Sequence, residues 1–272
     1  MVVTFARLRQ RLGAGLTAGL TALAIAAPPV MAQSPATPTT LAEAWLAQLE
    51  RENGPIAWSH SVALHRDSAA RLPERRARLV EELTTLVISA RVAGNVSLAE
   101  GLAAWAAALE DDDPVAARTP GRFDLPWLGA NLRQDPPLAA LVDWGTCAVP
   151  DWVEVWSLAG VTRLPWRPGL SLTQLVSELP REARGRADHA ALIDPLGQIR
   201  RAGIAAWNRD SDPLAPGSRV MVQLPGPQGL RGALPFPGTT VESELINERL
   251  PAYLATRLPG DECRLQGTGD KK

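Results

Sequence analysis

The side chains with catalytic or metal-binding chemistry are few and widely spaced in this chain. The three histidines, His60, His65 and His189, do not repeat at the spacing of two ligands on one helical face. No Gly-x-Ser-x-Gly elbow occurs, and no phosphate-binding glycine loop follows a strand-like segment. Glu178 and Glu182 have the chemistry of a glycoside-hydrolysing pair, but no pattern places them in a cleft. We therefore interpret them as a solvated helix face and expect structural, partly exposed histidines.

An acidic run, Asp111–Asp113, is the remaining group with ligand chemistry. Carboxylates bind hard cations, but this run ends at Pro114 directly after a helix-like segment and has no further ligand nearby. A solvated helix end is the simpler interpretation. The sequence thus predicts no catalytic residue, no metal site and no cofactor.

Tryptophan is the stronger signal, because the chain contains nine. Aromatic rings can stack on the apolar C–H faces of sugars, although tryptophan also fills ordinary cores, and for any single one the core is the favoured location. Trp127, Trp144 and Trp166 lie in segments rich in proline and glycine. These three are the better candidates for exposed contacts.

The N-terminal segment has the three-part pattern of a secretory signal peptide. Arg7, Arg9 and Arg11 precede an apolar stretch over 12–27, and small residues precede a predicted cleavage after Ala32. A retained anchor is the alternative, although the stretch barely reaches spanning length. We expect a soluble protein outside the cytoplasm, with no stable membrane span after cleavage. Its net charge of −1, which becomes more negative without the leader arginines, disfavours nucleic acid as a partner.

The chain contains two cysteines, Cys147 and Cys263, and they do not have the spacing of a zinc site. An even pair in an oxidising compartment is a candidate disulfide. We therefore predict one bond between them.

Helices are predicted in the first half of the chain. Thr40 and Glu43 form a capping-box pattern ahead of an apolar stripe. A longer helix is expected over 73–93, with Pro73 in its first turn, and a second capping box at Ser97 starts another helix that ends before Pro114. The short connection predicts an antiparallel helical hairpin.

Strands dominate after residue 115. Two strands over 152–158 and 161–166 are predicted to form a hairpin, and Ser171 caps a short helix. Three further strands are expected over 189–194, 198–204 and 218–224, the first two joined by the type I turn Asp-Pro-Leu-Gly. Hairpin, helix and then strands is the order of a β-grasp domain, in which a mixed sheet wraps over one helix.

A final helix is predicted over 241–258. Ile246, Leu250, Leu254 and Leu258 recur every four residues and so lie on one face, while Pro251 should kink or restart the helix. Such a face either covers the core of its own domain or docks on a partner, and the first is the commoner case.

Several blocks, in order, resemble the GfcC family of capsule biosynthesis proteins. The strongest is "VEVWSLAGVTRLPWRPGLSLTQLV", followed by "ALIDPLGQIRRAGIAAWN" and "PLAPGSRVMVQL". Upstream, "GPIAWSHSVALHRDSAA" and "TPGRFDLPWLGANLRQDPPL" are also similar to family blocks. The resemblance covers roughly residues 41–258.

This resemblance implies an α+β fold with two β-grasp domains similar to the SLBB-like modules of polysaccharide export channels. The implied organisation is a first domain over 33–150 with a helical hairpin inserted at about 55–113, a second domain over 151–232, and a C-terminal amphipathic helix over 240–258. The family opens with a β-hairpin before its first helix. Here only "QSPATPTT" stands between the predicted cleavage point and that helix, so we expect a truncated first domain.

The resemblance also implies a function. Family members are periplasmic accessory proteins of capsule or exopolysaccharide assembly and export, without established catalysis. The expected partners are polysaccharide or the outer-membrane export machinery. The alternatives are an envelope enzyme that hydrolyses or modifies glycans and a structural partner of an export channel that contacts no sugar.

The resemblance singles out Arg122, because Gly121-Arg122 matches a Gly-Arg element that follows the helical hairpin in the family. We predict a ligand-facing patch at Arg122, with Trp127 and Trp166 as further members. A guanidinium can pair with the carboxylates of acidic sugars or with phosphate. The alternative is that Arg122 bridges the hairpin to the sheet through backbone carbonyls.

Overall fold

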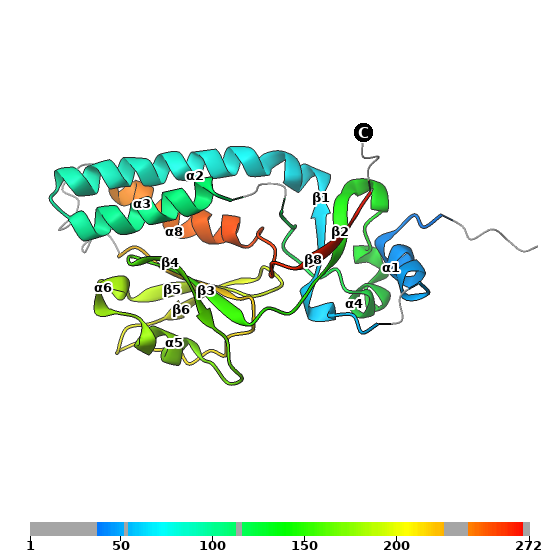
Figure 1. Ribbon diagram of the computed structural model, residues 1–272. Coiled ribbons are helices and arrows are strands. Elements are labelled where there is room, and N and C mark those ends of the chain that lie inside the picture. Colours follow the sequence, from blue (N-terminus) through cyan, green and yellow to red (C-terminus); the bar gives the residue numbers. More distant parts are fainter. Residues whose placement is uncertain (1–36, 52–53, 113–115, 226–238, 269–272) are drawn as a thin grey trace, which may run out of the picture. The chain divides into compact units, whose positions relative to one another are not determined.

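The computed structural model describes residues 37–51, 54–112, 116–225 and 239–268, shown as coloured ribbon in Figure 1. The predicted signal peptide, 1–32, lies outside these residues. The elements below all belong to the unit that begins at Pro38. Among the helices of the described residues, none is both long enough and apolar enough to cross a membrane.

Helix α1 (Leu41–Leu49) begins at the predicted capping box. The hydroxyl of Thr40 accepts a hydrogen bond from the backbone N–H of Glu43 at 3.4 Å, and the Glu43 carboxylate accepts one from the N–H of Thr40 at 3.3 Å. Two of the free N–H groups of the first turn are satisfied in this way. Local sequence alone therefore determines where α1 starts.

Helices α2 (Arg66–Val92) and α3 (Val96–Glu110) form the predicted hairpin and lie side by side in Figure 1. The predicted start at Pro73 is wrong, because α2 begins at Arg66 and contains Pro73 in its interior. The second capping box is also wrong. Gly94 ends α2 with a φ of 72°, and Asn95 caps α3 by accepting from the N–H of Leu98 at 3.2 Å.

The second half contains a mixed five-stranded sheet with the order β4-β3-β7-β5-β6. Strands β3 and β7 are parallel, and the other neighbouring pairs are antiparallel. The bounds are β3 (Trp152–Ser157), β4 (Gly160–Pro165), β5 (His189–Ile193), β6 (Ile199–Gly203) and β7 (Arg219–Val222). The predicted strand segments are confirmed, and the fold is α+β with mixed sheets.

This sheet is covered on both faces (Figure 1). Val153, Val155 and Val220 point into a core with α5 (Leu172–Glu178), which begins at the predicted cap Ser171. The residues between them, including Trp156 and Met221, point into a second core built with α2, α3 and α8 (Thr239–Leu254). Alternate side chains of each strand thus pack against helices on opposite faces of the sheet. The short helix α6 (Arg181–Arg184) follows α5.

Helix α8 runs through Pro251 and ends at Leu254, so the prediction that it reaches residue 258 is wrong. Ile246, Leu250 and Leu254 are fully buried in the core shared with the hairpin and the sheet. Leu258 lies beyond the helix and is only partly buried. The apolar stripe therefore covers the protein's own core.

A three-stranded antiparallel sheet has the order β1-β2-β8, and none of its strands was predicted. The strands are β1 (Ser61–His65), β2 (Leu141–Cys147) and β8 (Cys263–Gly267). Cys147 and Cys263 lie opposite each other in adjacent strands and are joined by a disulfide, with Cα atoms 3.9 Å apart.

An aromatic cluster packs against this sheet. Trp45 contacts Trp144 and Trp58 edge-to-face, at ring-centroid distances of 4.6 and 5.3 Å. The remaining short helices near it are α4 (Leu125–Ala130), η1 (Trp58–His60), η2 (Leu132–Gln134) and η3 (Leu138–Ala140). Trp144 is buried in this core, so the expectation that it makes exposed contacts is wrong.

Candidate functional site

Residues 117–124 connect the helical hairpin to α4 and touch three other parts of the chain. Ala117 forms an isolated bridge with Arg257, just beyond α8. The N–H of Thr119 donates to the carbonyl of Ala63 in β1 at 2.8 Å, and that of Gly121 donates to the Leu196 carbonyl at 2.9 Å. The segment thereby joins the three-stranded sheet to the turn between β5 and β6.

Arg118 is the buried centre of this junction, with 1% of its surface exposed. Its guanidinium donates to the carbonyl oxygens of Ala255 at 3.1 Å, of Asp194 at 3.3 Å, and of Pro195. Burial, and then repulsion from Arg219, lower the pKa of Arg118 to about 9, opposed by the charge of Asp194. The bridge through backbone carbonyls that was considered for Arg122 is therefore made by Arg118, which no sequence pattern distinguished.

The turn that Arg118 contacts is tightly specified. The Asp194 carboxylate accepts from the N–H groups of Leu196 and Gln198 at 2.9 and 2.8 Å, and the Asp194 carbonyl accepts from Gly197 at 2.9 Å, as predicted for a turn over 194–197. Gly197 has a φ of +79°, and a Cβ there would lie 2.9 Å from the Ala255 carbonyl oxygen. Only glycine fits this close approach.

Arg122 lies four residues after Arg118 in the sequence and is half exposed. Its guanidinium forms a two-point ion pair with Asp124, with N–O distances of 3.0 and 3.1 Å. The Arg122 side chain is 47% exposed, whereas that of Asp124 is 4% exposed. Asp124 also caps α4 by accepting from the N–H of Trp127 at 2.9 Å. The Arg122 guanidinium carbon is 5.9 Å from the centroid of the Trp127 ring, so two of the three predicted site residues lie together.

A groove opens beside this ion pair, and we call it the Arg122 groove. It is lined by Trp58, His60, Arg122, Asp124, the turn residues 194–196, and Pro216, among others. These residues come from η1, from the segment before α4, and from two connections of the five-stranded sheet. The groove therefore depends on the junction that Arg118 holds.

His60 forms part of the groove wall but is 2% exposed, so the expectation of a partly exposed side chain is wrong. Its Nε2 lies 3.2 Å from the carbonyl oxygen of Pro216. Because a carbonyl only accepts, this nitrogen carries the proton, and Nδ1 accepts from the Ser59 hydroxyl at 3.0 Å. Burial lowers the pKa of His60, opposed by the Pro216 carbonyl and reinforced by Arg118. His60 is thus a neutral structural group.

Like Trp127, Trp166 is not among the residues that line the Arg122 groove. Its indole N–H donates to the carbonyl of Leu214 at 2.7 Å, and its ring packs at the edge of the core under α5. The structure therefore brings Arg122 and Trp127 together and places Trp166 at the five-stranded sheet, directly after β4.

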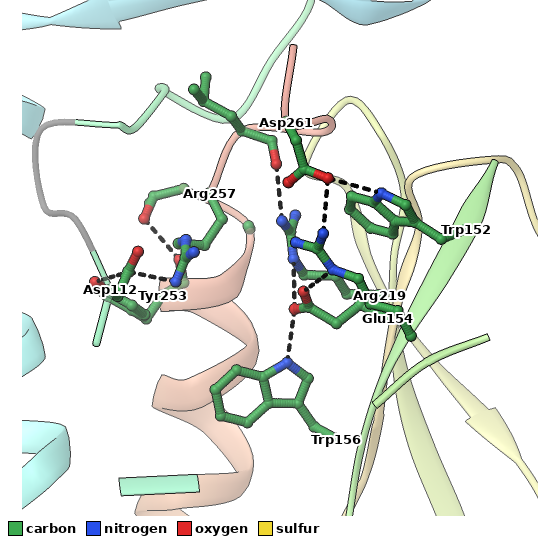
Figure 2. A network of polar contacts seen from close by, with 12 residues as sticks. Asp112, Trp152, Glu154, Trp156, Arg219, Tyr253, Arg257 and Asp261 are labelled. Carbon is green, nitrogen blue, oxygen red and sulfur yellow. Dashed lines mark hydrogen bonds and ion pairs between the residues drawn. The ribbon is translucent and has the colours of Figure 1, made fainter. Parts of the chain in front are cut away.

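A buried polar network lies under the junction, centred on Glu154 in β3 (Figure 2). Glu154 accepts from Arg219 at 3.0 Å, from the Trp156 indole at 2.9 Å and from Arg163 at 3.3 Å. Burial acts to raise the pKa of Glu154, but the charge of Arg219, the Trp156 hydrogen bond and the charge of Arg163 outweigh it, so the pKa is lowered. Glu154 is therefore a buried carboxylate that stays ionised.

The same network reaches the chain that leads into β8. Arg163 also pairs with Asp261 at 2.7 Å, and the Trp152 indole donates to that carboxylate at 3.1 Å. Arg219 donates to the carbonyl of Leu258 at 2.8 Å. The sequence did carry a signal for this network, because a single charge inside an apolar strand, as in "WVEVW" and "SRVMV", indicates a buried ion pair.

A second polar group lies at the end of α8 (Figure 2). The Tyr253 hydroxyl donates to the Asp112 carboxylate at 2.6 Å, and Arg257 pairs with the same carboxylate at 2.5 Å. Burial raises the pKa of Asp112, although Tyr253 and Arg257 act to lower it. The solvated helix end expected for the acidic run is therefore wrong at Asp112, which is 6% exposed.

The other candidates for catalysis do not assemble. Glu178 pairs with Arg167, Glu182 is exposed on α6, and the ring of His189 contacts Trp207. Within the described ranges, no group of three or more histidine, cysteine or acidic side chains is placed to hold a metal ion.

These features define an α+β protein in which a helical hairpin, a mixed sheet and a small antiparallel sheet meet at buried arginines. Residues 160–259 match the family model described as capsule biosynthesis GfcC C-terminal. The match runs from β4 to the chain just beyond α8. It confirms the predicted resemblance to this capsule biosynthesis family over these residues.

Proposed function

We propose that the mature chain is a non-catalytic periplasmic accessory protein of capsule or exopolysaccharide biosynthesis and export. The observation that carries this proposal is the capsule-family match over 160–259. Its partners in this proposal are polysaccharide or the outer-membrane export machinery. The predicted signal peptide supports the periplasmic location.

The proposed architecture is a β-grasp domain of the SLBB-like kind over 151–232. The strand order is β4-β3-β7-β5-β6, and its central strands β3 and β7, which come first and last along the chain, are parallel. This order, with α5 packed on one face, supports the assignment. Strands β1 and β2 belong to the proposed first domain over 33–150. Strand β8 adds to that sheet from the far end of the chain.

The proposed binding residues are Arg122 and Trp127. A guanidinium has five N–H groups, and the two-point pair with Asp124 uses two of them, which leaves three for a ligand. Asp124 fixes the orientation of the guanidinium and neutralises its charge. A fixed donor beside an aromatic ring suits sugar hydroxyls and an apolar sugar face.

The test is Arg122→Ala in the native gene, with surface display of the polysaccharide and thermal unfolding as readouts. We expect display to be lost while stability falls by no more than about 1 kcal/mol, because Arg122 is half exposed and Asp124 keeps its hydrogen bond from the N–H of Trp127. Arg133→Ala is the matched control, since Arg133 is exposed and does not line the groove. Normal display in a stable Arg122→Ala strain would remove Arg122 from the site. Normal display in a strain that lacks the whole gene would contradict the capsule role itself.

A further inference from the structure

A second groove lies at the other end of the five-stranded sheet, and we call it the basic groove. Its walls come from α6, the connection to β5, and the turn after β6. Four arginines line it, together with one acid, Asp188; the arginines are Arg181, Arg184, Arg186 and Arg209. This is a local excess of positive charge on a chain whose net charge is −1.

The four arginines of the basic groove have no acidic partners among the residues that the structure describes. Some exposed arginines elsewhere are paired, as Arg78 is with Glu74 and Arg167 with Glu178, while others such as Arg91 form no ion pair in the described chain. The Nε of Arg184 is buried and lacks a hydrogen-bond partner in the described chain. Guanidinium groups are rarely left without acceptors when they are withdrawn from water, so this groove has donors available for a ligand.

A tryptophan stands in the turn that forms one wall. Trp207 is 75% exposed, which is unusual for so large an apolar ring. The turn itself is well held, because the Asn208 side chain accepts from the N–H of Ala205 at 3.0 Å and donates to the Asp188 carbonyl at 3.0 Å. Gly203 lets the turn pack back on β6, since a Cβ there would lie 1.8 Å from the Asn208 carbonyl oxygen. Trp207 is thus presented to solvent by a fixed backbone.

We propose that the basic groove binds an acidic polysaccharide, with sugar carboxylates on the arginines and a sugar ring on Trp207. Guanidinium groups pair with carboxylates in a two-point geometry, and an aromatic face complements sugar C–H groups. The anionic character of the ligand rests on the arginines, while its being a glycan rests on the proposed function. The groove is separate from the Arg122 groove, since the two share no lining residue.

The experiment titrates the mature, disulfide-bonded chain with polygalacturonate, and with uncharged dextran as the neutral probe. The test variant is the triple Arg181→Gln, Arg186→Gln and Arg209→Gln, which leaves the partly buried Arg184 in place. We expect its affinity for polygalacturonate to fall about a hundredfold, because each of the three lost pairs is solvent-exposed and worth roughly fivefold. Wild-type affinity should fall as salt is added, and dextran should bind far more weakly.

A matched control carries the same change in net charge elsewhere. Arg51→Gln, Arg91→Gln and Arg133→Gln remove three exposed arginines that line neither groove, and polygalacturonate affinity should stay within about twofold of wild type. Trp207→Ala, a single surface change that keeps all the arginines, should weaken binding about fivefold to tenfold.

Equal losses in the two triple variants would overturn the proposal, because net charge alone would then explain binding. So would equal binding of dextran, or wild-type affinity in the test triple. Binding to phosphatidylglycerol vesicles but not to polygalacturonate would also overturn it in favour of a lipid surface. These outcomes concern binding in vitro, and the deletion strain tests the capsule role independently of them.

Discussion

In the Arg122 groove one exposed guanidinium is held by the buried carboxylate of Asp124, whereas in the basic groove four guanidiniums share a wall with the single acid Asp188. The first arrangement fixes direction and cancels charge, so it favours neutral hydrogen-bonding partners. The second leaves charge uncompensated, so it attracts anions. The same residue type therefore supports two kinds of recognition, and the neighbouring carboxylates determine which.

The two grooves also differ in how they are built. The basic groove is lined by residues 181–209, nearly one stretch of chain on one sheet. The Arg122 groove is assembled from segments between residues 58 and 216, which Arg118 and the disulfide-linked sheet hold together. Perturbations of the junction should therefore damage the Arg122 groove first.

The largest effect is expected from removal of the disulfide by Cys147→Ser with Cys263→Ser. The bond closes a loop with a sequence separation of 116 residues, so its loss should lower the free energy of unfolding by about 4–5 kcal/mol on the loop-entropy model. Urea unfolding of the variant and the oxidised wild type measures this. Polygalacturonate binding under native conditions should persist, because the basic groove lies away from β2 and β8. Two free thiols in the unfolded, non-reduced wild type would show that the bond does not form.

The next largest effect is a difference in stability between variants of Arg118 and of Arg122. Arg118→Met should lower the free energy of unfolding by about 3 kcal/mol or more, because three backbone carbonyls in a buried site each lose a hydrogen bond from the guanidinium. Arg122→Met should cost no more than about 1 kcal/mol. Denaturant unfolding of both variants gives the difference, and similar losses in the two would contradict the assignment of Arg118 as the bridge.

The contrast between a region built from one stretch of chain and a region assembled from distant segments also separates what the sequence could predict from what it could not. The five-stranded sheet comes from consecutive segments whose signals are local: the Ser171 cap, the turn over 194–197, and alternating apolar strands. The three-stranded sheet comes from segments nearly 200 residues apart in β1 and β8. Its strands are short, and only pairing over long distances stabilises them, so no local pattern predicted them.

The site residues follow the same rule. Sequence pattern led to Arg122 through a family element, but burial decides that Arg118 bridges the junction and that Arg122 faces solvent. The three arginines of the "REARGR" run are visible in the sequence. That Arg209 lines the same groove depends on the β5–β6 pairing, which no composition argument supplies.

Lowering the pH should have a smaller effect on stability, and it should act through Glu154 under the junction. The pKa of Glu154 is lowered from 4.5, so its ionised form stabilises the fold above that pH, and this contribution is lost as the pH falls through the lower, folded value. The stability difference between wild type and Glu154→Gln should therefore narrow as the pH falls below 4.5. Asp112, whose pKa is raised, has the opposite sign but is present in both proteins. Urea unfolding at several pH values measures the gap, and a constant gap would mean that Glu154 does not titrate differently in the folded state.

The smallest effect is expected from a substitution that makes the Arg122 groove more like the basic groove. Asp124→Asn removes the carboxylate that neutralises Arg122 but keeps a residue that caps α4 equally well, so we expect a stability loss of only about 1 kcal/mol. Arg122 would then be a guanidinium without an acidic partner beside Trp127, as the arginines of the basic groove are without acidic partners.

The gain is best measured in the background of the triple variant Arg181→Gln, Arg186→Gln and Arg209→Gln, which has lost the basic groove. There Asp124→Asn should raise polygalacturonate affinity by about threefold to tenfold, the range expected of one released charge, and added salt should abolish the gain. Adding Arg122→Gln should remove it as well. If affinity rises equally when Arg122 is absent, general charge is responsible. If it does not rise at all, the pairing of an arginine with its neighbouring acid is not what separates the two grooves.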